Sequence, residues 1–234
     1  MDLETYSRTH PQLLASSLPP LLAVATAAGS GHVVDLGCGE GSNVQGLLDN
    51  NLVERITAVD LSDLRIKQVQ KLDPRVTGIV SDACAVTQLP DACADGVIVS
   101  QVIEHVPDPA ALLAEVARLA KPGAWWYIGS VARADKAWWL YKVDGVRRLD
   151  PTHVREYKSL PDFLNHLQNP DLTLTKSRSA KVSYSLGDMA ILATSKAYRQ
   201  RPEQLPKAVQ RLRSLPGRIH PPGFTIVEAV GTRN

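Results

Sequence analysis

A glycine-rich turn at residues 37–41 offers the clearest chemistry in this sequence. It follows a short apolar run, and its three glycines alternate with Cys38 and Glu40. Glycines at a strand-to-helix turn let the backbone approach a ligand closely, and the amino terminus of the following helix faces an anionic group. A dinucleotide-binding GxGxxG pattern would place its third glycine at the position of Ser42. The turn therefore predicts a small-molecule site, and it weakens the case for a nicotinamide cofactor without excluding one.

Three acidic residues accompany this turn and the predicted strands after it. Asp35 comes just before the turn, where its carboxylate suits an ammonium group on the ligand. Asp60 ends a second predicted strand, where an acid can accept both hydroxyl groups of a ribose. Asp82 follows a third strand and could accept from an adenine amino group. A ribose is common to NAD and S-adenosylmethionine, whereas an amino-acid ammonium beside an adenosine belongs to S-adenosylmethionine.

Alternating strands and helices must position these acids. Short β-rich runs at 32–36, 55–59, 76–81, 96–100 and 124–129 are separated by helical patterns that begin at residues 42, 62 and 109. Ser62 and Pro109 suit the first positions of their helices. This alternation implies right-handed βαβ units in a doubly wound α/β sheet. Further helices are predicted at 159–167 and 187–215, and further strands within 172–182 and at 224–232.

The order of these motifs resembles that of the class I S-adenosylmethionine-dependent methyltransferases. Residues 35–41 look like their first motif, Asp60, Asp82 and the segment 97–105 fall where later motifs belong, and the resemblance covers about residues 30–130. Residues 101–109 are similar to the ubiquinone- and menaquinone-type small-molecule methyltransferases. The resemblance implies a Rossmann-like seven-stranded sheet whose last strand, residues 224–232, runs antiparallel between the fifth and sixth. It also implies that S-adenosylmethionine and its product S-adenosylhomocysteine contact Asp35, Gly37, Cys38, Gly39, Asp60, Leu61, Asp82, Ala83, Ser100 and Gln101.

Two histidines are candidates for the general base that methylation of an alcohol or phenol would use. His105 begins the turn after the fourth predicted strand, and His153 lies beyond the fifth, near several arginines whose positive charge favours a neutral imidazole. A structural role is the alternative for each. Some ubiquinone-pathway enzymes hold a cation with a Glu-x-x-Glu-His pattern after the fourth strand. Because Gln101 replaces the first acid of that pattern here, we expect no metal site.

Residues 131–158 and 187–215 are predicted to form a cap over the site, because the connection that leaves the fifth strand emerges at the edge that holds the cofactor. Six of the twelve aromatic residues lie between positions 125 and 141. They either pack the insertion or line an apolar wall for the acceptor. The arginines of the insertion could bind a carboxylate or phosphate of the acceptor bidentately. Candidate acceptor-binding residues are Trp138, Tyr141, Arg148, Arg155 and Tyr157.

Length and composition favour one domain over residues 1–234, and the resemblance implies that it is a methyltransferase domain. We divide it into an N-terminal helical segment at 1–29, a cofactor-binding core at 30–130 and the cap. Of the residues, 44% are hydrophobic, and the three cysteines lack CxxC spacing. We therefore expect no disulfide framework, no signal peptide and no membrane span, and hence a soluble cytoplasmic protein.

Charge is distributed unevenly along the chain. Residues 1–130 carry 8 Lys and Arg against 15 Asp and Glu, whereas residues 131–234 carry 18 against 9. A basic second half suits an anionic small-molecule acceptor or, alternatively, an RNA or protein substrate. Aromatic residues do not interleave with the basic run at 199–218, which disfavours nucleic acid. Together with this, the resemblance implies O-methylation of a natural-product, sugar or quinone-like small molecule, and we expect a monomer or homodimer. A non-catalytic cofactor-binding scaffold is a third possibility.

Overall fold

The computed structural model describes residues 18–27, 29–134, 137, 141–143, 145–185, 218–220 and 223–234. Its helices are α2 (Pro20–Thr26), α3 (Ser42–Asp49), α4 (Asp63–Val69), α5 (Pro109–Leu119) and α6 (Leu160–Asn165). Its strands are β1 (Ser30–Leu36), β2 (Val53–Asp60), β3 (Val76–Val80), β4 (Ala94–Ser100), β5 (Ala120–Arg133), β6 (Tyr141–Val143), β7 (Val146–Arg148), β8 (Leu172–Lys181), β9 (Tyr184–Ser185), β10 (Arg218–Ile219) and β11 (Phe224–Arg233).

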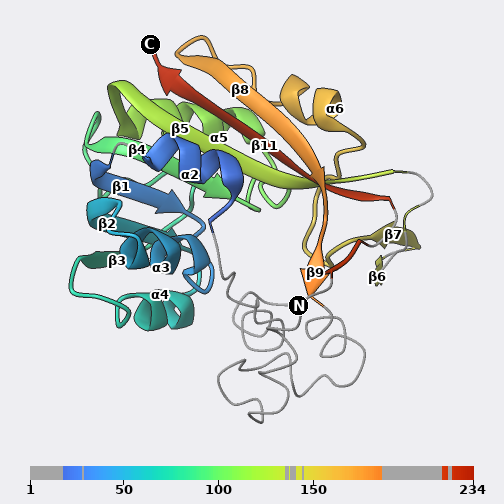
Figure 1. The fold of residues 1–234 in the computed structure, drawn as a ribbon, viewed down its shortest axis with the longest axis horizontal. Coiled ribbons are helices and arrows are strands. Elements are labelled where there is room, and N and C mark those ends of the chain that lie inside the picture. The colour runs from blue at the N-terminus through green and yellow to red at the C-terminus, as the bar shows by residue number, and fades with distance from the viewer. Residues whose placement is uncertain are drawn as a thin grey trace.

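Within these residues, seven strands form one sheet in the order β3-β2-β1-β4-β5-β11-β8. The strands β1 to β5 pair with one another in parallel, and β11 runs antiparallel to both β5 and β8. Figure 1 shows β11, which comes last in the chain, lying between β5 and β8. The predicted Rossmann-like sheet and the place of its antiparallel strand are confirmed.

Helices cover both faces of the sheet. One layer contains α2, α3 and α4, whose buried side chains, such as Leu22, Leu47 and Ile66, form one apolar cluster. The other layer contains α5 and α6, whose Leu112 and Phe163 belong to the second cluster. Figure 1 shows α2 and α5 on opposite sides of β5. Covering both faces explains why the central strands are apolar almost without interruption.

Local signals define the helix starts as predicted. The Ser62 hydroxyl accepts a hydrogen bond from the Arg65 amide at the start of α4, and Pro109 occupies the first turn of α5. Several strand boundaries differ from the prediction by a few residues. The largest difference at a strand start is in β5, which begins at Ala120 and not at residue 124. The residues around Gly123, with φ of +77°, form an irregularity in the pairing with β4 and do not separate helix from strand.

The insertion after β5 returns to the sheet. Strands β6 and β7 form an antiparallel hairpin, and the Arg133 amide then donates to the Tyr157 carbonyl at 2.7 Å. The amides of Val154 and Arg155 both donate to the carbonyl of Glu104, in the turn after β4. This return segment therefore lies at the carboxyl edge of the sheet, as predicted. The second part of the predicted cap, residues 187–215, lies outside the described residues, so the cap stays a prediction.

Candidate active site

The glycine turn packs tightly against the neighbouring turn of the sheet. Gly37, Gly39 and Gly41 have φ of +73°, +55° and +84°, values that favour glycine. The Gly37 amide donates to the carbonyl of Val59 at 2.7 Å. A Cβ atom at Gly37 would lie 2.3 Å from a Cγ2 atom of Val102, which follows β4. Both the conformation and the space therefore require glycine at position 37.

Asp35 places a buried carboxyl group directly before this turn. Its side chain is 0% exposed, and neither carboxylate oxygen has a hydrogen-bonding partner among the described residues. Burial, with a smaller effect from the Asp60 carboxylate, raises the pKa of Asp35 to about 7. A buried acid without a partner is unfavourable on its own and would be stabilised by a positively charged ligand group. This carboxyl group therefore fits the ammonium of the predicted cofactor.

Asp60 holds the glycine turn against the end of β2. One of its oxygens accepts from the Gly39 amide at 3.0 Å, and the other accepts from the Ser62 amide at 2.9 Å. Arg65 Nη1 lies 3.8 Å from the first oxygen and adds a positive charge. Leu61, the next residue, leaves 57% of its apolar side chain exposed at the same edge. A fixed acid beside an open apolar side chain suits a ribose and an adenine ring.

The ends of β3 and β4 complete the edge. Asp82, directly beyond β3, is exposed and accepts from the Cys84 amide at 2.8 Å, with the buried Ala83 beside it. Ser100 ends β4, and the amide of Gln101 donates to the Gly129 carbonyl at 2.8 Å. Gln101 has φ of +57°, which is uncommon for a residue with a side chain and is found at functional turns. The parallel pairing thus brings the predicted cofactor-binding segments to one edge.

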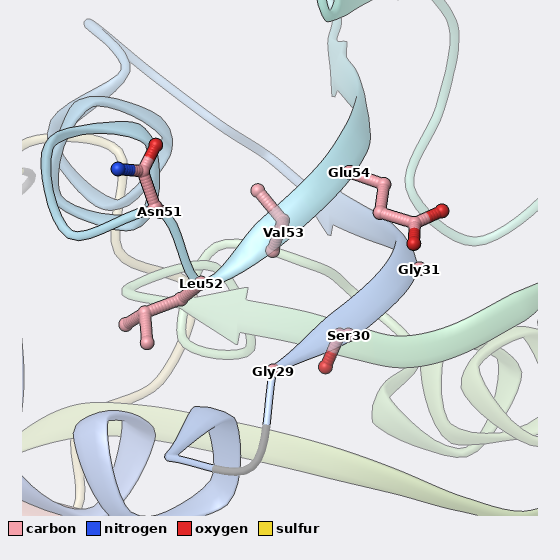
Figure 2. Close-up of a pocket in the computed structure, with 7 residues that line it drawn as sticks. All are labelled: Gly29, Ser30, Gly31, Asn51, Leu52, Val53 and Glu54. Carbon is pink, nitrogen blue, oxygen red and sulfur yellow. The ribbon is translucent and has the colours of Figure 1, made fainter.

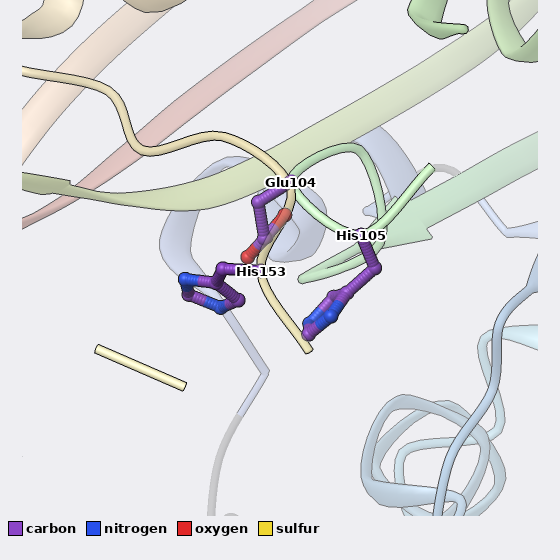
Figure 3. A group of neighbouring side chains, drawn as sticks. All are labelled: Glu104, His105 and His153. Carbon is purple, nitrogen blue, oxygen red and sulfur yellow. The ribbon is translucent and has the colours of Figure 1, made fainter. Parts of the chain in front are cut away.

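The two candidate histidines lie side by side, although 48 residues separate them in the chain. Their rings meet edge to face with centroids 4.7 Å apart, and Figure 3 shows them coming from two different segments. Burial, followed by the effect of His153, lowers the pKa of His105 to about 4, and burial also lowers the pKa of His153. The expected effect of arginine on His153 is present from Arg148, but it is smaller than burial and is opposed by Asp150 and Glu156. Both rings are therefore neutral near pH 7.

Thr152 connects one of these histidines to a carboxylate, a contact that the sequence analysis missed. The Thr152 hydroxyl lies 2.9 Å from Nδ1 of His105 and donates to Asp150 Oδ1 at 2.6 Å. The Thr152 amide also donates to that carboxylate oxygen, at 2.8 Å. The signal available in the sequence was the short run Asp150-Pro151-Thr152-His153.

Glu104 joins the histidines in a group of three possible metal ligands. Its side chain is 1% exposed, and neither carboxylate oxygen has a hydrogen-bonding partner among the described residues. Burial raises the pKa of Glu104 to about 7. Figure 3 shows Glu104 beside both rings, and the ligand atoms of the three residues lie within 4.8 Å of one another. The expected absence of a metal rests on Gln101 alone and stays a prediction.

The predicted acceptor-binding residues have other contacts in the structure. Arg155 donates to the carbonyls of Ile103 at 2.6 Å and Pro107 at 2.7 Å, and Arg148 donates to the carbonyl of His153. These arginines bind loop backbone, and their expected contact with an acceptor anion stays a prediction. Tyr157 is 1% exposed and contacts the ring of Phe163, so its side chain packs in the core, and its contact with an acceptor also stays a prediction. Trp138 lies outside the described residues, and only the backbone of Tyr141 is described.

A separate surface depression of about 380 Å³ lies at the other edge of the sheet. It is lined at the amino ends of β1 and β2, as Figure 2 shows, by Gly29, Ser30, Gly31, Asn51, Leu52, Val53 and Glu54. Because the glycine turn and the strand-end acids lie at the carboxyl ends, this depression contains no residue of the site. Among the described helices, none is both long and apolar enough to cross a membrane.

The sheet order, the glycine turn and the strand-end acids together define a class I methyltransferase fold. Residues 34–128 match the family model described as "Methyltransferase domain". A ubiquinone biosynthesis O-methyltransferase of Nitrosomonas europaea is 33% identical over 150 residues, which cover 58% of this chain. That match spans 60% of the relative's own length.

Solved structures confirm the fold and also show how widely it is used. The 1,6-didemethyltoxoflavin-N1-methyltransferase of Burkholderia thailandensis is 18% identical with a TM-score of 0.57, over 92% of this chain and 77% of that one. Its structure contains 1,6-didemethyltoxoflavin and S-adenosylhomocysteine. The [4+2]-cyclase SpnF is 17% identical with a TM-score of 0.62, over 92% of this chain and 78% of that one. The fold alone therefore does not decide the reaction, and the site residues must.

Proposed function

We propose that this protein is an S-adenosylmethionine-dependent methyltransferase that methylates a hydroxyl group of a small molecule. The observation that carries the proposal is the unpartnered, buried carboxyl group of Asp35 beside the glycine turn. Such a group needs a positively charged ligand to be stable in its ionised form. The ammonium of S-adenosylmethionine supplies that charge.

The residues divide the work of binding. Asp35 would accept from the cofactor ammonium, Asp60 from the ribose hydroxyls and Asp82 from the adenine amino group. Because Asp60 is already held by two backbone amides, it is preorganised to receive the ribose. When bound, S-adenosylmethionine supplies an electrophilic methyl group with its own leaving group, so the protein has mainly to orient the acceptor and to receive its proton.

The neutral histidine pair supports oxygen as the methylated atom. A hydroxyl group becomes a better nucleophile as its proton moves to a base, and an uncharged imidazole is able to receive it. The lowered pKa of His105, about 4, makes it a weak base and therefore favours an acidic hydroxyl, such as that of a phenol, over a sugar alcohol. This agrees with the name of the relative at 33% identity, a ubiquinone biosynthesis O-methyltransferase.

Calorimetric titration with S-adenosylmethionine tests the proposal. The Asp60→Ala variant should bind the cofactor more weakly by about 1.5–3 kcal/mol, the range for hydrogen bonds to a charged group. The matched control is Asp171→Ala, at an exposed turn before β8, which should bind like the wild type. A panel of phenols and alcohols, analysed by mass spectrometry for methylated products, then tests turnover. Unchanged affinity in Asp60→Ala, or preferential binding of NAD, would contradict the proposal.

A further inference from the structure

The contact between Thr152 and His105 determines where the proton of that imidazole lies. An ionised carboxylate only accepts hydrogen bonds, so the single hydroxyl proton of Thr152 is directed to Asp150 at 2.6 Å. Toward His105, 2.9 Å away, the same oxygen can then only accept. Nδ1 of His105 must therefore carry a proton and donate. Because a neutral imidazole has one such proton, its other nitrogen, Nε2, has a free lone pair.

We propose that Thr152 and Asp150 are positioning residues that hold His105 in the Nδ1-protonated tautomer, so that Nε2 receives the proton of the acceptor hydroxyl. In the transfer, the O–H bond of the acceptor breaks and its proton moves to Nε2, giving an imidazolium. An electron pair of the oxygen forms the new bond to the methyl carbon, and the pair of the broken S–C bond stays on sulfur. The imidazolium then returns its proton to water. The role of Nε2 as proton acceptor rests on the proposed function, whereas the Nδ1-protonated tautomer of His105 does not depend on it.

Several groups of the protein surround His105. The side chain is half-buried, its ring meets the ring of His153 edge to face with centroids 4.7 Å apart, and Glu104 is adjacent in the chain. Asp150 and the Arg65 guanidinium of α4 are the other charged groups that act on it. The Thr152 hydroxyl is the side-chain hydrogen-bonding partner of the ring among the described residues, and the backbone of Thr152 also acts on the pKa of His105.

His153 lacks an equivalent arrangement. Its Nδ1 has no hydrogen-bonding partner in the described part of the chain and lies 3.6 Å from an oxygen of Glu156. Both oxygens of Glu156 already accept other bonds, from Arg133 at 2.9 Å and from the Leu149 amide at 2.5 Å. The geometry therefore selects His105, of the two histidines, as the one whose proton-accepting atom is fixed.

The tautomer can be read directly by NMR of the full-length protein labelled with ¹⁵N-histidine. The two ring nitrogens of a histidine differ in chemical shift according to which one is protonated, and His105→Gln identifies the signals of residue 105. We expect a protonated Nδ1 and an unprotonated Nε2 in the wild type. Thr152→Val keeps the shape of the side chain but removes the acceptor, so the Nε2-protonated form should become the major one. Thr152→Ser should retain the wild-type tautomer.

Kinetics with an acceptor identified from the panel provide the second measurement. Thr152→Val should lower kcat about tenfold or more, while its affinity for S-adenosylmethionine stays within about twofold of the wild type. Thr152→Ser should restore kcat. The matched control is Thr77→Val, at an exposed position of β3, which should change neither the tautomer nor kcat.

Three results would overturn the inference: a protonated Nε2 in the wild type, an unchanged tautomer in Thr152→Val, or an altered tautomer in that variant with normal kcat. Because Thr152→Ser changes only one methyl group, it keeps the comparison valid if the valine variant folds poorly. If the wild type methylates no acceptor, the proposed function fails, and the NMR comparison of wild type with Thr152→Ser and Thr152→Val still decides whether Thr152 fixes the tautomer.

Discussion

Asp35 should make the stability of the ligand-free protein fall as the pH rises. Its pKa is about 7 in the folded protein against 3.8 for an ordinary aspartate, so the folded state binds this proton more tightly than the unfolded state does. The free energy of unfolding therefore declines between about pH 4 and pH 7, as the unfolded chain loses the proton first, and is level above that range. The substitution that removes this effect is Asp35→Asn, which has nearly the same shape and no charge.

The size of the effect follows from the shift. A difference of about 3 pKa units corresponds to roughly 4 kcal/mol, which is the full penalty for ionising Asp35 above pH 7. At about pH 5 the unfolded aspartate is already ionised, so about 1.5 kcal/mol of that penalty is present there. From about pH 5 to pH 8, the wild type should thus lose roughly 2–3 kcal/mol more stability than Asp35→Asn does.

Urea unfolding of both proteins at the two pH values measures this double difference. Other titrating groups, including Glu104 and the histidines, are common to the two chains and cancel in the comparison. The cost of burying an amide in place of an acid also cancels, since it does not depend on pH. Parallel pH dependences in the two proteins would refute the reasoning, because they would mean that Asp35 ionises without a penalty in the folded state.

Three further outcomes are expected. Binding of S-adenosylmethionine at about pH 6 should release about one proton, because the ammonium of the cofactor favours the ionised form of Asp35. The release is measured as a dependence of the binding enthalpy on the ionisation enthalpy of the buffer, and its absence in the wild type would contradict the pairing of Asp35 with the ammonium. His105→Ala should lower kcat by about 10²-fold, the scale for a general base, and His153→Ala should lower it less, both with cofactor affinity near wild type; normal turnover of His105→Ala across about pH 6–9 would remove that residue from the mechanism. EDTA should leave activity unchanged, whereas loss of activity that Mg²⁺ or Zn²⁺ restores would show that Glu104 and the histidines hold a required metal.

The cofactor edge could be predicted from the sequence because local patterns determine it. The apolar runs define the strands, and parallel pairing then brings the carboxyl ends of those strands to one edge, as it does for Asp60 and Asp82. Even the fine detail of a capping serine at position 62 follows from its neighbours. Each of these inferences depends on a few consecutive residues.

The pairing of His105 with His153 could not be predicted in this way. It depends on the return of the segment after β7, whose amides at 154 and 155 bind the Glu104 carbonyl. An irregular segment has no periodicity that would reveal its destination. The same limitation explains why the contacts of Arg155 could not be predicted. Its charge suggested that it binds an anion. In the structure it donates to the carbonyls of Ile103 and Pro107, which lie in an irregular turn and need donors.

The position of β11 also has a consequence for synthesis on the ribosome. Strand β8 hydrogen-bonds to β11 in the sheet, and β11 is made about forty residues after β8 ends. During that interval β8 has no neighbour to pair with, and β5 has one open edge on which another chain could add a strand. Lys176, Arg178 and Lys181 place positive charge along β8, which discourages such pairing between nascent chains. Substitution of Lys176 and Lys181 by apolar residues should therefore reduce the yield of folded protein more than its final stability, whereas Arg178 also pairs with the buried Glu228 in the folded sheet.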